Sequence, residues 1–256
     1  MKLAILGATG RMGAAITRLA LVDPKVQVVG VTSRHSVGKS VPGSDLWYTD
    51  QVAEAIAPAD VVIDFSLPEG IRFHLPIVTQ SHKPYVTGTT GLSDRDMQLL
   101  WNASQCIPVL WAPNMSIGIT LLKNIVEQLA SQLDESFDIE ILEMHHRNKQ
   151  DAPSGTALVL GECAARGRGR TLKQEERRCR TGGRQKGDIG FAALRGGNLV
   201  GDCTVIFAGE EEIIKIHHSA LTRDMFAKGA LLAAKWLKDQ PAKMYDMSAV
   251  FSKVKS

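Results

Sequence analysis

Short apolar runs alternate with longer, helix-periodic segments through the first 111 residues of the chain. The short runs are rich in β-branched residues and predict buried strands, whereas apolar residues that recur every three or four positions predict helices. A helix is expected at residues 12–21, and further helices are expected between the later strands. The expected strands lie at residues 2–6, 26–31, 60–65, 85–87 and 107–111. This alternation indicates an α/β fold with a Rossmann-type doubly wound parallel sheet.

The pattern changes at about residue 117. An amphipathic helix is predicted at residues 117–133, and residues 137–144 alternate apolar and polar in the manner of a half-exposed strand. A helix rich in Ala and Leu is expected at residues 224–238. The remaining expected strands lie at residues 189–194, 199–207 and 212–218, the last two joined by a tight connection at 208–210. We therefore expect a second, α+β domain with an open mixed or antiparallel sheet.

Bulk composition is that of an ordinary globular protein, with 44% hydrophobic and 22% charged residues. The net charge of +3 gives no indication of nucleic-acid binding. The N-terminal apolar run is interrupted at Gly7, too early for a secretion signal, and no apolar run is long enough to span a bilayer. The cysteines, which show no close spacing and favour reduced thiols, are Cys106, Cys163, Cys179 and Cys203. We therefore expect a cytoplasmic protein that binds neither nucleic acid nor membrane.

One segment is strongly basic. Residues 166–187 carry nine Lys or Arg against two Glu, a local charge of +7. A solvated, mobile loop and a basic rim that attracts anionic ligands both account for this charge. Nucleic-acid binding is disfavoured because the segment has no aromatic residues on which bases would stack.

A glycine-rich turn, Gly7, Gly10 and Gly13, stands between the first strand and the first helix. Glycine lets the backbone approach a pyrophosphate, and the helix N-terminus supplies N–H groups and the positive end of its dipole. The spacing is G-x-x-G-x-x-G rather than G-x-G-x-x-G, so a tight turn without a ligand remains an alternative. The position of the turn favours a dinucleotide site.

The end of the second strand bears on which dinucleotide is used. Many NAD enzymes place an acid there, but this chain has Thr32, Ser33 and Arg34. A carboxylate would repel a 2′-phosphate, whereas a hydroxyl and a guanidinium would bind it. We therefore expect NADPH to be preferred over NADH, with Lys39 as a weaker second cation. The alternative for Arg34 is an ordinary surface arginine.

Proton carriers are concentrated in the stretch EMHHRNKQDAPSGTA, residues 143–157. His145 and His146 would point to opposite sides if the preceding strand persists. Lys149 would share a face with His145 if the chain turns helically there. A histidine and a lysine beside a site for an anion suit a reaction that protonates a bound acid.

The same stretch contains a helix start. Ser154 is a natural N-cap for a helix that opens with Gly155 and Thr156. The N–H groups of its first turn and the Thr156 hydroxyl could hold a carboxylate. The possible metal ligands nearby are Glu143, His145, His146 and Asp151. We expect no metal, because Lys149 would place a positive charge among these ligands and no H-E-x-x-H motif occurs.

Together these segments resemble the 4-hydroxy-tetrahydrodipicolinate reductases, also called dihydrodipicolinate reductases, of bacterial diaminopimelate and lysine biosynthesis. The resemblance runs across nearly the whole chain, and the string H-H-x-x-K-x-D-A-P-S-G-T-A is highly specific. The matching stretches are GATGRMG, VIDFSLPEG, GTTG, APNMSIG, EMHHRNKQDAPSGTAL, DIGFAALRGGNLVGDCTVIFAGEEE and LTRDMFAKGAL.

The resemblance implies an NAD(P)H-dependent oxidoreductase that reduces 4-hydroxy-tetrahydrodipicolinate, with loss of water, to tetrahydrodipicolinate. Hydride would pass from the nicotinamide to the conjugated C=C–C=N system of the ring, and Lys149 would protonate the charge that develops. His145 would be a proton donor or acceptor. His146, Gly155 and Thr156 would bind the dicarboxylate substrate, which needs positive surroundings.

The resemblance also implies a division of the chain. Residues 1–116 and 222–256 would form the dinucleotide-binding domain, and residues 117–221 the substrate-binding and tetramerisation domain of a homotetramer. The implied cofactor-binding residues are Gly7, Ala8, Thr9, Gly10, Arg11, Met12, Ser33, Arg34, Gly88, Thr89, Thr90, Ala112, Pro113, Asn114 and Met115. Many members have an acid before the arginine of the second strand and use both cofactors. Ser33 replaces that acid here, which favours NADPH and leaves NADH possible.

Two other functions fit the glycine turn less well. A short-chain dehydrogenase or epimerase needs Tyr-x-x-x-Lys, and none of the three tyrosines, Tyr48, Tyr85 and Tyr245, is followed by such a lysine. A non-catalytic dinucleotide sensor would have no use for the paired histidines and the lysine.

Overall fold

The computed structural model describes residues 1–177 and 182–252. The chain divides into two compact units, Met1–Ile117 with Arg223–Ser256, and Gly118–Thr222. Each unit has its own sheet and its own buried core. Cys179 lies outside the described residues, and the other three cysteines are free.

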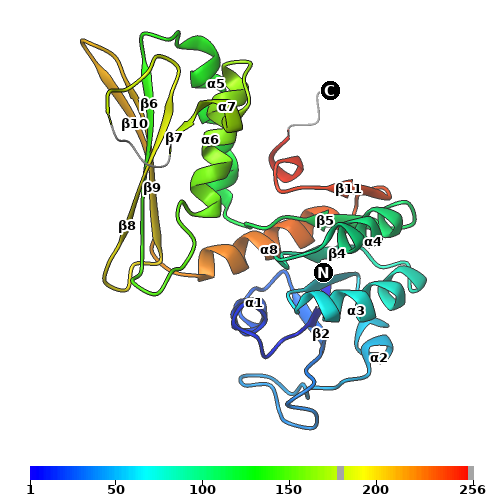
Figure 1. The fold of residues 1–256 in the computed structure, drawn as a ribbon. Coiled ribbons are helices and arrows are strands. Elements are labelled where there is room, and N and C mark those ends of the chain that lie inside the picture. The colour runs from blue at the N-terminus through cyan, green and yellow to red at the C-terminus, as the bar shows by residue number, and fades with distance from the viewer. Residues whose placement is uncertain (178–181, 253–256) are drawn as a thin grey trace. The chain divides into compact units, whose positions relative to one another are not determined.

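The first unit contains a six-stranded sheet in the order β11-β5-β4-β3-β1-β2, and every pairing in it is parallel (Figure 1). Its strands are β1 Lys2–Leu6, β2 Gln27–Val31, β3 Val61–Asp64, β4 Tyr85–Thr87, β5 Pro108–Trp111 and β11 Lys243–Tyr245. Its helices are α1 Arg11–Leu21, α2 Val52–Ile56, α3 Pro68–Gln80, α4 Asp94–Ser104, α8 Asp224–Leu237 and the 3₁₀ turn η1 Ala249–Phe251. The predicted doubly wound parallel sheet is confirmed.

Alternate residues of the central strand serve two different cores. Leu3 and Ile5 of β1 pack with α1 and α8 on one face, and Ala4 and Leu6 pack with α2, α3 and α4 on the other. Side chains of a strand alternate between the faces of a sheet, so burial on both faces requires an unbroken apolar run. That requirement explains why the apolar run at residues 2–6 predicted β1 at its observed bounds.

The edge strand β11 was not predicted. It is three residues long, begins with Lys243 and pairs in parallel with β5, with Lys243 opposite Pro108. Such a short edge strand has too few apolar positions to show a period, and its partner strand supplies the hydrogen bonds that define it.

The second unit contains a five-stranded mixed sheet in the order β10-β9-β6-β8-β7. Strand β6 pairs in parallel with β8 and antiparallel with β9, which decides between the mixed and antiparallel alternatives. Its strands are β6 Asp138–His145, β7 Glu176–Arg177, β8 Ile189–Arg195, β9 Gly201–Ala208 and β10 Ile213–Ala220. Its helices are α5 Ile117–Gln132, α6 Gly155–Gly167 and α7 Leu172–Glu175.

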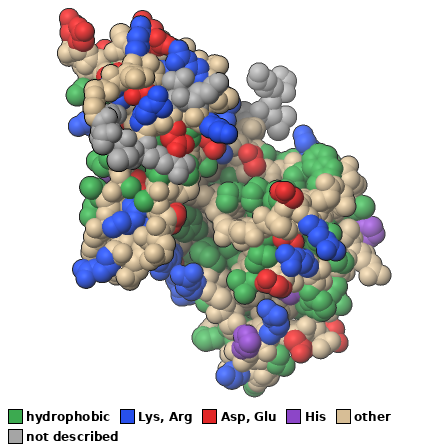
Figure 2. All heavy atoms as spheres, in the orientation of Figure 1, with side chains coloured by type: hydrophobic (Ala, Val, Ile, Leu, Met, Phe, Trp, Pro, Cys, Tyr) green, Lys and Arg blue, Asp and Glu red, His purple; other side chains and the backbone are tan. Residues whose placement is uncertain are grey.

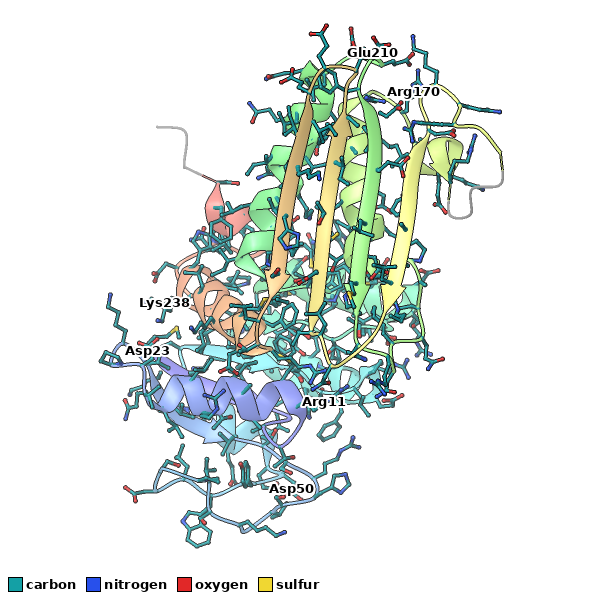
Figure 3. All side chains as sticks on the ribbon, turned by 90° about the vertical axis from the view of Figure 1, so that its left-hand side faces the viewer. Arg11, Asp23, Asp50, Arg170, Glu210 and Lys238 are labelled. Carbon is teal, nitrogen blue, oxygen red and sulfur yellow. The ribbon has the colours of Figure 1, made fainter. Side chains whose placement is uncertain are left out.

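Helices α5 and α6 lie on the same face of this second sheet, and Figure 3 looks onto the opposite, uncovered face. The covered face builds the core with Ile139, Ile141, Val205 and Phe207. The large apolar side chains of the described strands of this sheet that are exposed are Leu142, Leu194 and Ile213. The face that no described helix covers thus carries exposed apolar side chains among its polar ones.

Candidate active site

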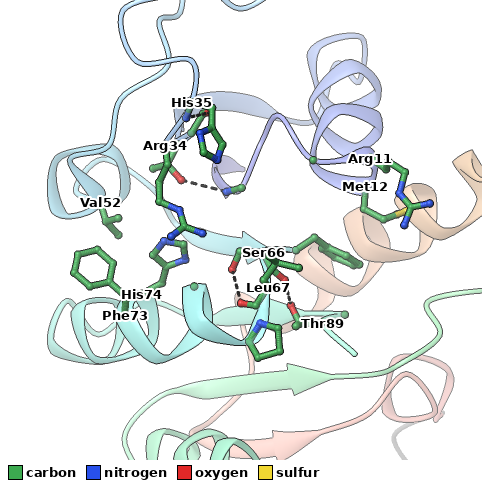
Figure 4. A pocket seen from close by; sticks show the side chains of 18 of the residues that line it. Arg11, Met12, Arg34, His35, Val52, Ser66, Leu67, Phe73, His74 and Thr89 are labelled. Carbon is green, nitrogen blue, oxygen red and sulfur yellow. Dashed lines mark hydrogen bonds between the residues drawn. The ribbon is translucent and has the colours of Figure 1, made fainter. Parts of the chain in front are cut away.

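A pocket of about 520 Å³ lies in the first unit, where the strand order reverses between β1 and β3 (Figure 4). Open α/β sheets bind ligands at this switch point, outside the carboxyl ends of the strands. The residues that line it are Gly7, Gly10, Arg11, Met12, Thr32, Ser33, Arg34, His35, Asp50, Val52, Phe65, Ser66, Leu67, Pro68, Gly70, Phe73, His74, Gly88, Thr89 and Thr90. The structure therefore brings together the glycine turn, the end of β2 and two later strand ends.

The glycine turn needs its glycines for two different reasons. Gly7 has a φ of +69°, in the left-handed region that favours glycine. A Cβ atom on Gly13 would lie 2.1 Å from the Gly7 carbonyl oxygen, so only glycine lets α1 pack this closely against the turn. Helix α1 begins at Arg11, and within the described residues no side chain caps its N-terminus at Gly10. Its first N–H groups are therefore available to an anion.

The end of β2 is tied to this turn. The Ser33 side chain is buried, and its hydroxyl lies 2.9 Å from the Thr9 hydroxyl. The Gly7 N–H donates to the Thr32 hydroxyl and the Ala8 N–H to the Thr32 carbonyl, at 3.2 and 2.9 Å. Ser33 therefore holds two elements together as well as lining the pocket.

Arg34 is exposed, and no ion pair among the described residues engages its guanidinium. In Figure 4 it extends from the end of β2 toward the pocket, as does His74 from α3. Sequence reasoning found no acid at this strand end, but Asp50, which follows the bridge between Thr32 and Thr49, also lines the pocket. No spacing rule pointed to Asp50, because that bridge joins residues from separate segments.

The ends of the later strands differ in whether they line the pocket. The Thr89 hydroxyl donates to the Ser66 carbonyl at 2.8 Å, and the Trp111 indole donates to the Thr89 carbonyl at 3.0 Å. Residues 112–115 follow β5 at the same edge of the sheet but do not line the pocket. Two of them, Ala112 and Met115, are buried, and the Asn114 side chain accepts a hydrogen bond from the Ser116 N–H.

A buried carboxylate beneath the pocket was missed by the sequence analysis. Asp64, at the end of β3, is fully buried and lies 2.8 Å from His74 Nδ1, the Tyr85 hydroxyl and the Ser66 N–H. Burial alone would raise the pKa of Asp64, but these hydrogen bonds hold the pKa below its ordinary value. Burial, followed by the Asp64 charge, raises the pKa of Tyr85 well above its ordinary value. Asp64 thus fixes the ring of His74, which lines the pocket.

In the second unit, His145 is the last residue of β6, so the strand does not persist through His146 as the opposite-sides expectation required. The chain turns instead, and the Lys149 N–H donates to the His146 carbonyl at 3.1 Å. The Lys149 side chain is 21% exposed, and its ammonium lies 2.8 Å from the Asp151 carboxylate. That hydrogen bond lowers the pKa of Asp151. The ammonium is thus held by an acid of its own turn.

The predicted N-cap is confirmed. The Ser154 hydroxyl accepts a hydrogen bond from the Ala157 N–H at 3.3 Å, and α6 opens with Gly155 and Thr156. Gly155 is exposed, and a Cβ atom there would meet nothing within 4 Å. The helix start therefore has open space beside it.

Glu143 links these features, and sequence reasoning considered it only as a possible metal ligand. Its carboxylate is 1% exposed and lies within hydrogen-bond distance of His145 Nδ1, the Ser154 N–H and the Arg195 guanidinium. Burial would raise the pKa of Glu143, but the bonds from Arg195 and His145 hold it below its ordinary value. No group of three or more metal-ligating side chains occurs within residues 1–177 and 182–252.

Of the nine basic residues of this segment, five that the structure describes form ion pairs with acids that lie outside it. Arg166 pairs with Glu127, Arg184 with Asp138 and Glu140, and Arg177 with Asp188. Further pairs are Arg170 and Lys186 with Glu135. Figure 2 shows acidic and basic side chains intermixed on this part of the surface. These pairs neutralise part of the segment's charge and so argue against a basic rim made by the described residues.

Comparisons with known proteins agree over nearly the whole chain. The family model described as "Dihydrodipicolinate reductase, N-terminus" matches residues 1–115, and "Dihydrodipicolinate reductase, C-terminus" matches residues 118–251. The 4-hydroxy-tetrahydrodipicolinate reductase of Zymomonas mobilis is 45% identical over 254 residues, which cover 98% of this chain and 96% of that protein. The one of Dinoroseobacter shibae is 42% identical over 258 residues, which cover 96% of each.

A solved structure shares the fold. The dipicolinate-bound dihydrodipicolinate reductase of Paenisporosarcina sp. TG-14 superposes with a TM-score of 0.73 at 23% identity, covering 96% of this chain and 97% of that one. None of the described helices is both long and apolar enough to cross a membrane. With two matching family models and full-length relatives at 42% and 45% identity, the chain belongs to the 4-hydroxy-tetrahydrodipicolinate reductase family of oxidoreductases.

Proposed function

We propose that this chain reduces 4-hydroxy-tetrahydrodipicolinate to tetrahydrodipicolinate, with loss of water, in diaminopimelate and lysine biosynthesis, and that it prefers NADPH over NADH. Besides membership of the family, one structural observation supports the proposed chemistry. The Glu143 carboxylate contacts both His145 Nδ1, at 2.6 Å, and the Ser154 N–H, at 3.0 Å. An imidazole and the start of a helix therefore lie side by side, as proton transfer to a bound anion requires.

The pocket of the first unit suits a dinucleotide. Its turn has a left-handed glycine, its helix lacks a capping side chain among the described residues, and an exposed arginine stands at the end of β2. The residues that would hold the nucleotide are Gly7, Ala8, Thr9, Gly10, Arg11, Met12, Ser33, Arg34, Gly88, Thr89 and Thr90, with residues 112–115 at the same sheet edge. When bound, the nicotinamide supplies the hydride.

The start of α6 would bind one carboxylate of the substrate. Gly155 and Thr156 present the N–H groups of its first turn, and the positive end of the helix dipole favours an anion there. His146, half-buried in the turn before the helix, would contact the same substrate. The Paenisporosarcina relative is described as binding dipicolinate, itself a dicarboxylate, which agrees with this assignment.

Lys149 would donate the proton that the reduced ring needs. Its ammonium is held by Asp151 and is partly exposed, so it can recover a proton from solvent after donating one. His145 would act beside it as a proton donor or acceptor, with Nδ1 bound to Glu143. Loss of water from the substrate leaves the conjugated ring, and the ring gains one hydride and one proton, so the atoms balance.

The test mixes the protein with NADPH and freshly generated substrate and follows the absorbance of the reduced nicotinamide. Lys149→Ala should lower turnover by about 10²–10⁴-fold, the usual contribution of a general acid, while NADPH still binds. Lys186→Ala is the matched control, because Lys186 also pairs with an acid, Glu135, but belongs to the basic segment. Near-normal turnover of the Lys149 variant would remove the proposed donor, and an inactive wild type would remove the proposed function.

The uncovered face of the second sheet favours the homotetramer. Exposed Leu142, Leu194 and Ile213 would be covered if the substrate-binding units associated through their sheets. Leu194→Glu should then lower the mass measured by light scattering, and an unchanged mass would count against this interface. The free thiols of Cys106, Cys163 and Cys203 are consistent with the reducing cytoplasm in which we place the enzyme.

A further inference from the structure

The buried carboxylate of Glu143 takes no chemical step of its own in this mechanism, but it contacts several parts of the proposed substrate site. Both of its oxygens are occupied: Oε2 lies 2.6 Å from His145 Nδ1 and 2.8 Å from Arg195 Nη1. Oε1 accepts from the Ser154 N–H at 3.0 Å and from Arg195 Nη2 at 2.8 Å. A buried charge is tolerated when hydrogen bonds replace its lost hydration, and four hydrogen bonds from three residues do so here.

The first consequence concerns the tautomer of His145. An ionised carboxylate only accepts hydrogen bonds, so the ring must carry a proton on Nδ1 to bind Glu143. In the neutral ring this leaves Nε2 as the basic nitrogen. Glu143 therefore decides which nitrogen of His145 can exchange a proton with a ligand.

A second residue, Gly201, keeps the space for this ring. A Cβ atom on Gly201 would lie 2.7 Å from His145 Nε2 and 2.9 Å from Cδ2. Any larger side chain would have to displace the imidazole or the start of β9. Gly201 thus makes room for the orientation that Glu143 selects.

Arg195 connects Glu143 to the turn that carries Lys149. Arg195 is the last residue of β8 and lies opposite His145 of β6 in the parallel pairing of these strands. Its Nη2 also donates to the Asp151 carbonyl at 2.6 Å. The Glu143–Arg195 pair therefore joins β6, the Lys149–Asp151 turn and the start of α6.

We propose that Glu143 is a positioning residue of the proton-transfer site, which fixes the Nδ1–H tautomer of His145 and the first turn of α6, and that Gly201 reserves the volume for the ring. This inference rests on the proposed function only in taking His145 and α6 as the substrate site. Neither residue needs to touch the substrate. Both act through the imidazole and the helix start.

The first measurement needs no substrate. In long-range ¹H–¹⁵N spectra of the full chain, at a pH where the ring is neutral, His145 should show a protonated Nδ1 and a bare Nε2. Glu143→Gln, which keeps the side-chain shape but offers a single acceptor oxygen, should shift the ring toward a mixture of tautomers. A wild-type ring protonated on Nε2 would overturn the proposal, whether or not any variant folds.

The second measurement separates the two units kinetically. Glu143→Gln should lower kcat by at least about tenfold and raise KM for the substrate, while the Kd for NADPH, bound in the other unit, is unchanged. Gly201→Ala should lower kcat likewise without removing any polar group. Gly183→Ala is the control, because a Cβ atom there meets nothing within 4 Å. Wild-type kinetics in both Glu143→Gln and Gly201→Ala would refute the positioning role, whereas an inactive wild type with the expected tautomer would refute only the reductase assignment.

Discussion

Replacing Arg34 by alanine should weaken NADPH binding and leave NADH binding nearly unchanged. The two cofactors differ only in the 2′-phosphate, and Arg34 is the exposed cation at the end of β2 that lines the pocket. Among the described residues its guanidinium has no competing ion pair. A phosphate would therefore not need to displace an internal partner in order to bind it.

The size of the effect follows from this exposure. A hydrogen bond to a charged group contributes about 1.5–3 kcal/mol. Solvent and salt screen a surface guanidinium, so the lower end of that range applies, about 1.5 kcal/mol. Since about 1.4 kcal/mol is a tenfold change in affinity, Arg34→Ala should raise the Kd for NADPH about tenfold. The loss should shrink at high ionic strength.

The assay is a titration of each cofactor by the fluorescence of the reduced nicotinamide, in the wild type and two variants. Arg95→Ala is the control, because Arg95 is an exposed arginine of α4 that does not line the pocket. Equal weakening of NADPH and NADH by Arg34→Ala would show that Arg34 does not recognise the 2′-phosphate. A wild type that prefers NADH would point instead to Asp50, whose carboxylate would suit ribose hydroxyls.

Three further changes test other parts of the structure. Gly13→Ala forces a Cβ atom to within 2.1 Å of a turn carbonyl, so it should cost about 1–3 kcal/mol of stability and weaken NADPH binding, as thermal unfolding with and without NADPH will show. The hydrogen bonds from Arg72 hold the pKa of Asp96 below its ordinary value. The ionised Asp96 therefore stabilises the fold at pH values above its ordinary pKa, and this contribution is lost as the pH falls through the lowered pKa. The wild type should lose more stability than Asp96→Asn on acidification, and equal losses would contradict this. Burial raises the pKa of Cys203 to about 12, so iodoacetamide at neutral pH should modify exposed Cys106 and spare Cys203 until the protein unfolds, as peptide mass spectrometry will report.

The elements that could be predicted from the sequence are those whose own residues show a clear apolar pattern. Strand β1 and helix α5 have long apolar patterns, and both are observed within one residue of their expected bounds. The strands β7 and β11 were not predicted, because they are only two and three residues long and are defined by their pairing with β8 and β5. A pattern within one segment holds no information about such a partner.

The same distinction separates the predicted from the missed site residues. The Ser154 cap was predictable because a cap bonds an N–H three residues along the chain. Glu143 and Arg195 are 52 residues apart and meet only because β6 and β8 pair in parallel. The ion pairs of the basic segment were not predictable for the same reason, since the acids that pair with Arg166 and Arg184 lie on α5 and β6.

A buried carboxylate organises the pocket of the first unit, and another organises the histidine-containing turn of the second unit. Asp64 fixes His74 at the pocket of the first unit, and Glu143 fixes His145 in the second. In each case an acid at or near the end of a strand holds Nδ1 of a histidine and also accepts a backbone N–H of the segment that follows, Ser66 or Ser154. A buried charge holds its partners firmly because leaving it unpaired costs several kcal/mol. The orientation of each imidazole ring therefore depends on a buried acid. Substitutions at Asp64 or Glu143 should change function although neither acid needs to contact the nucleotide or the substrate.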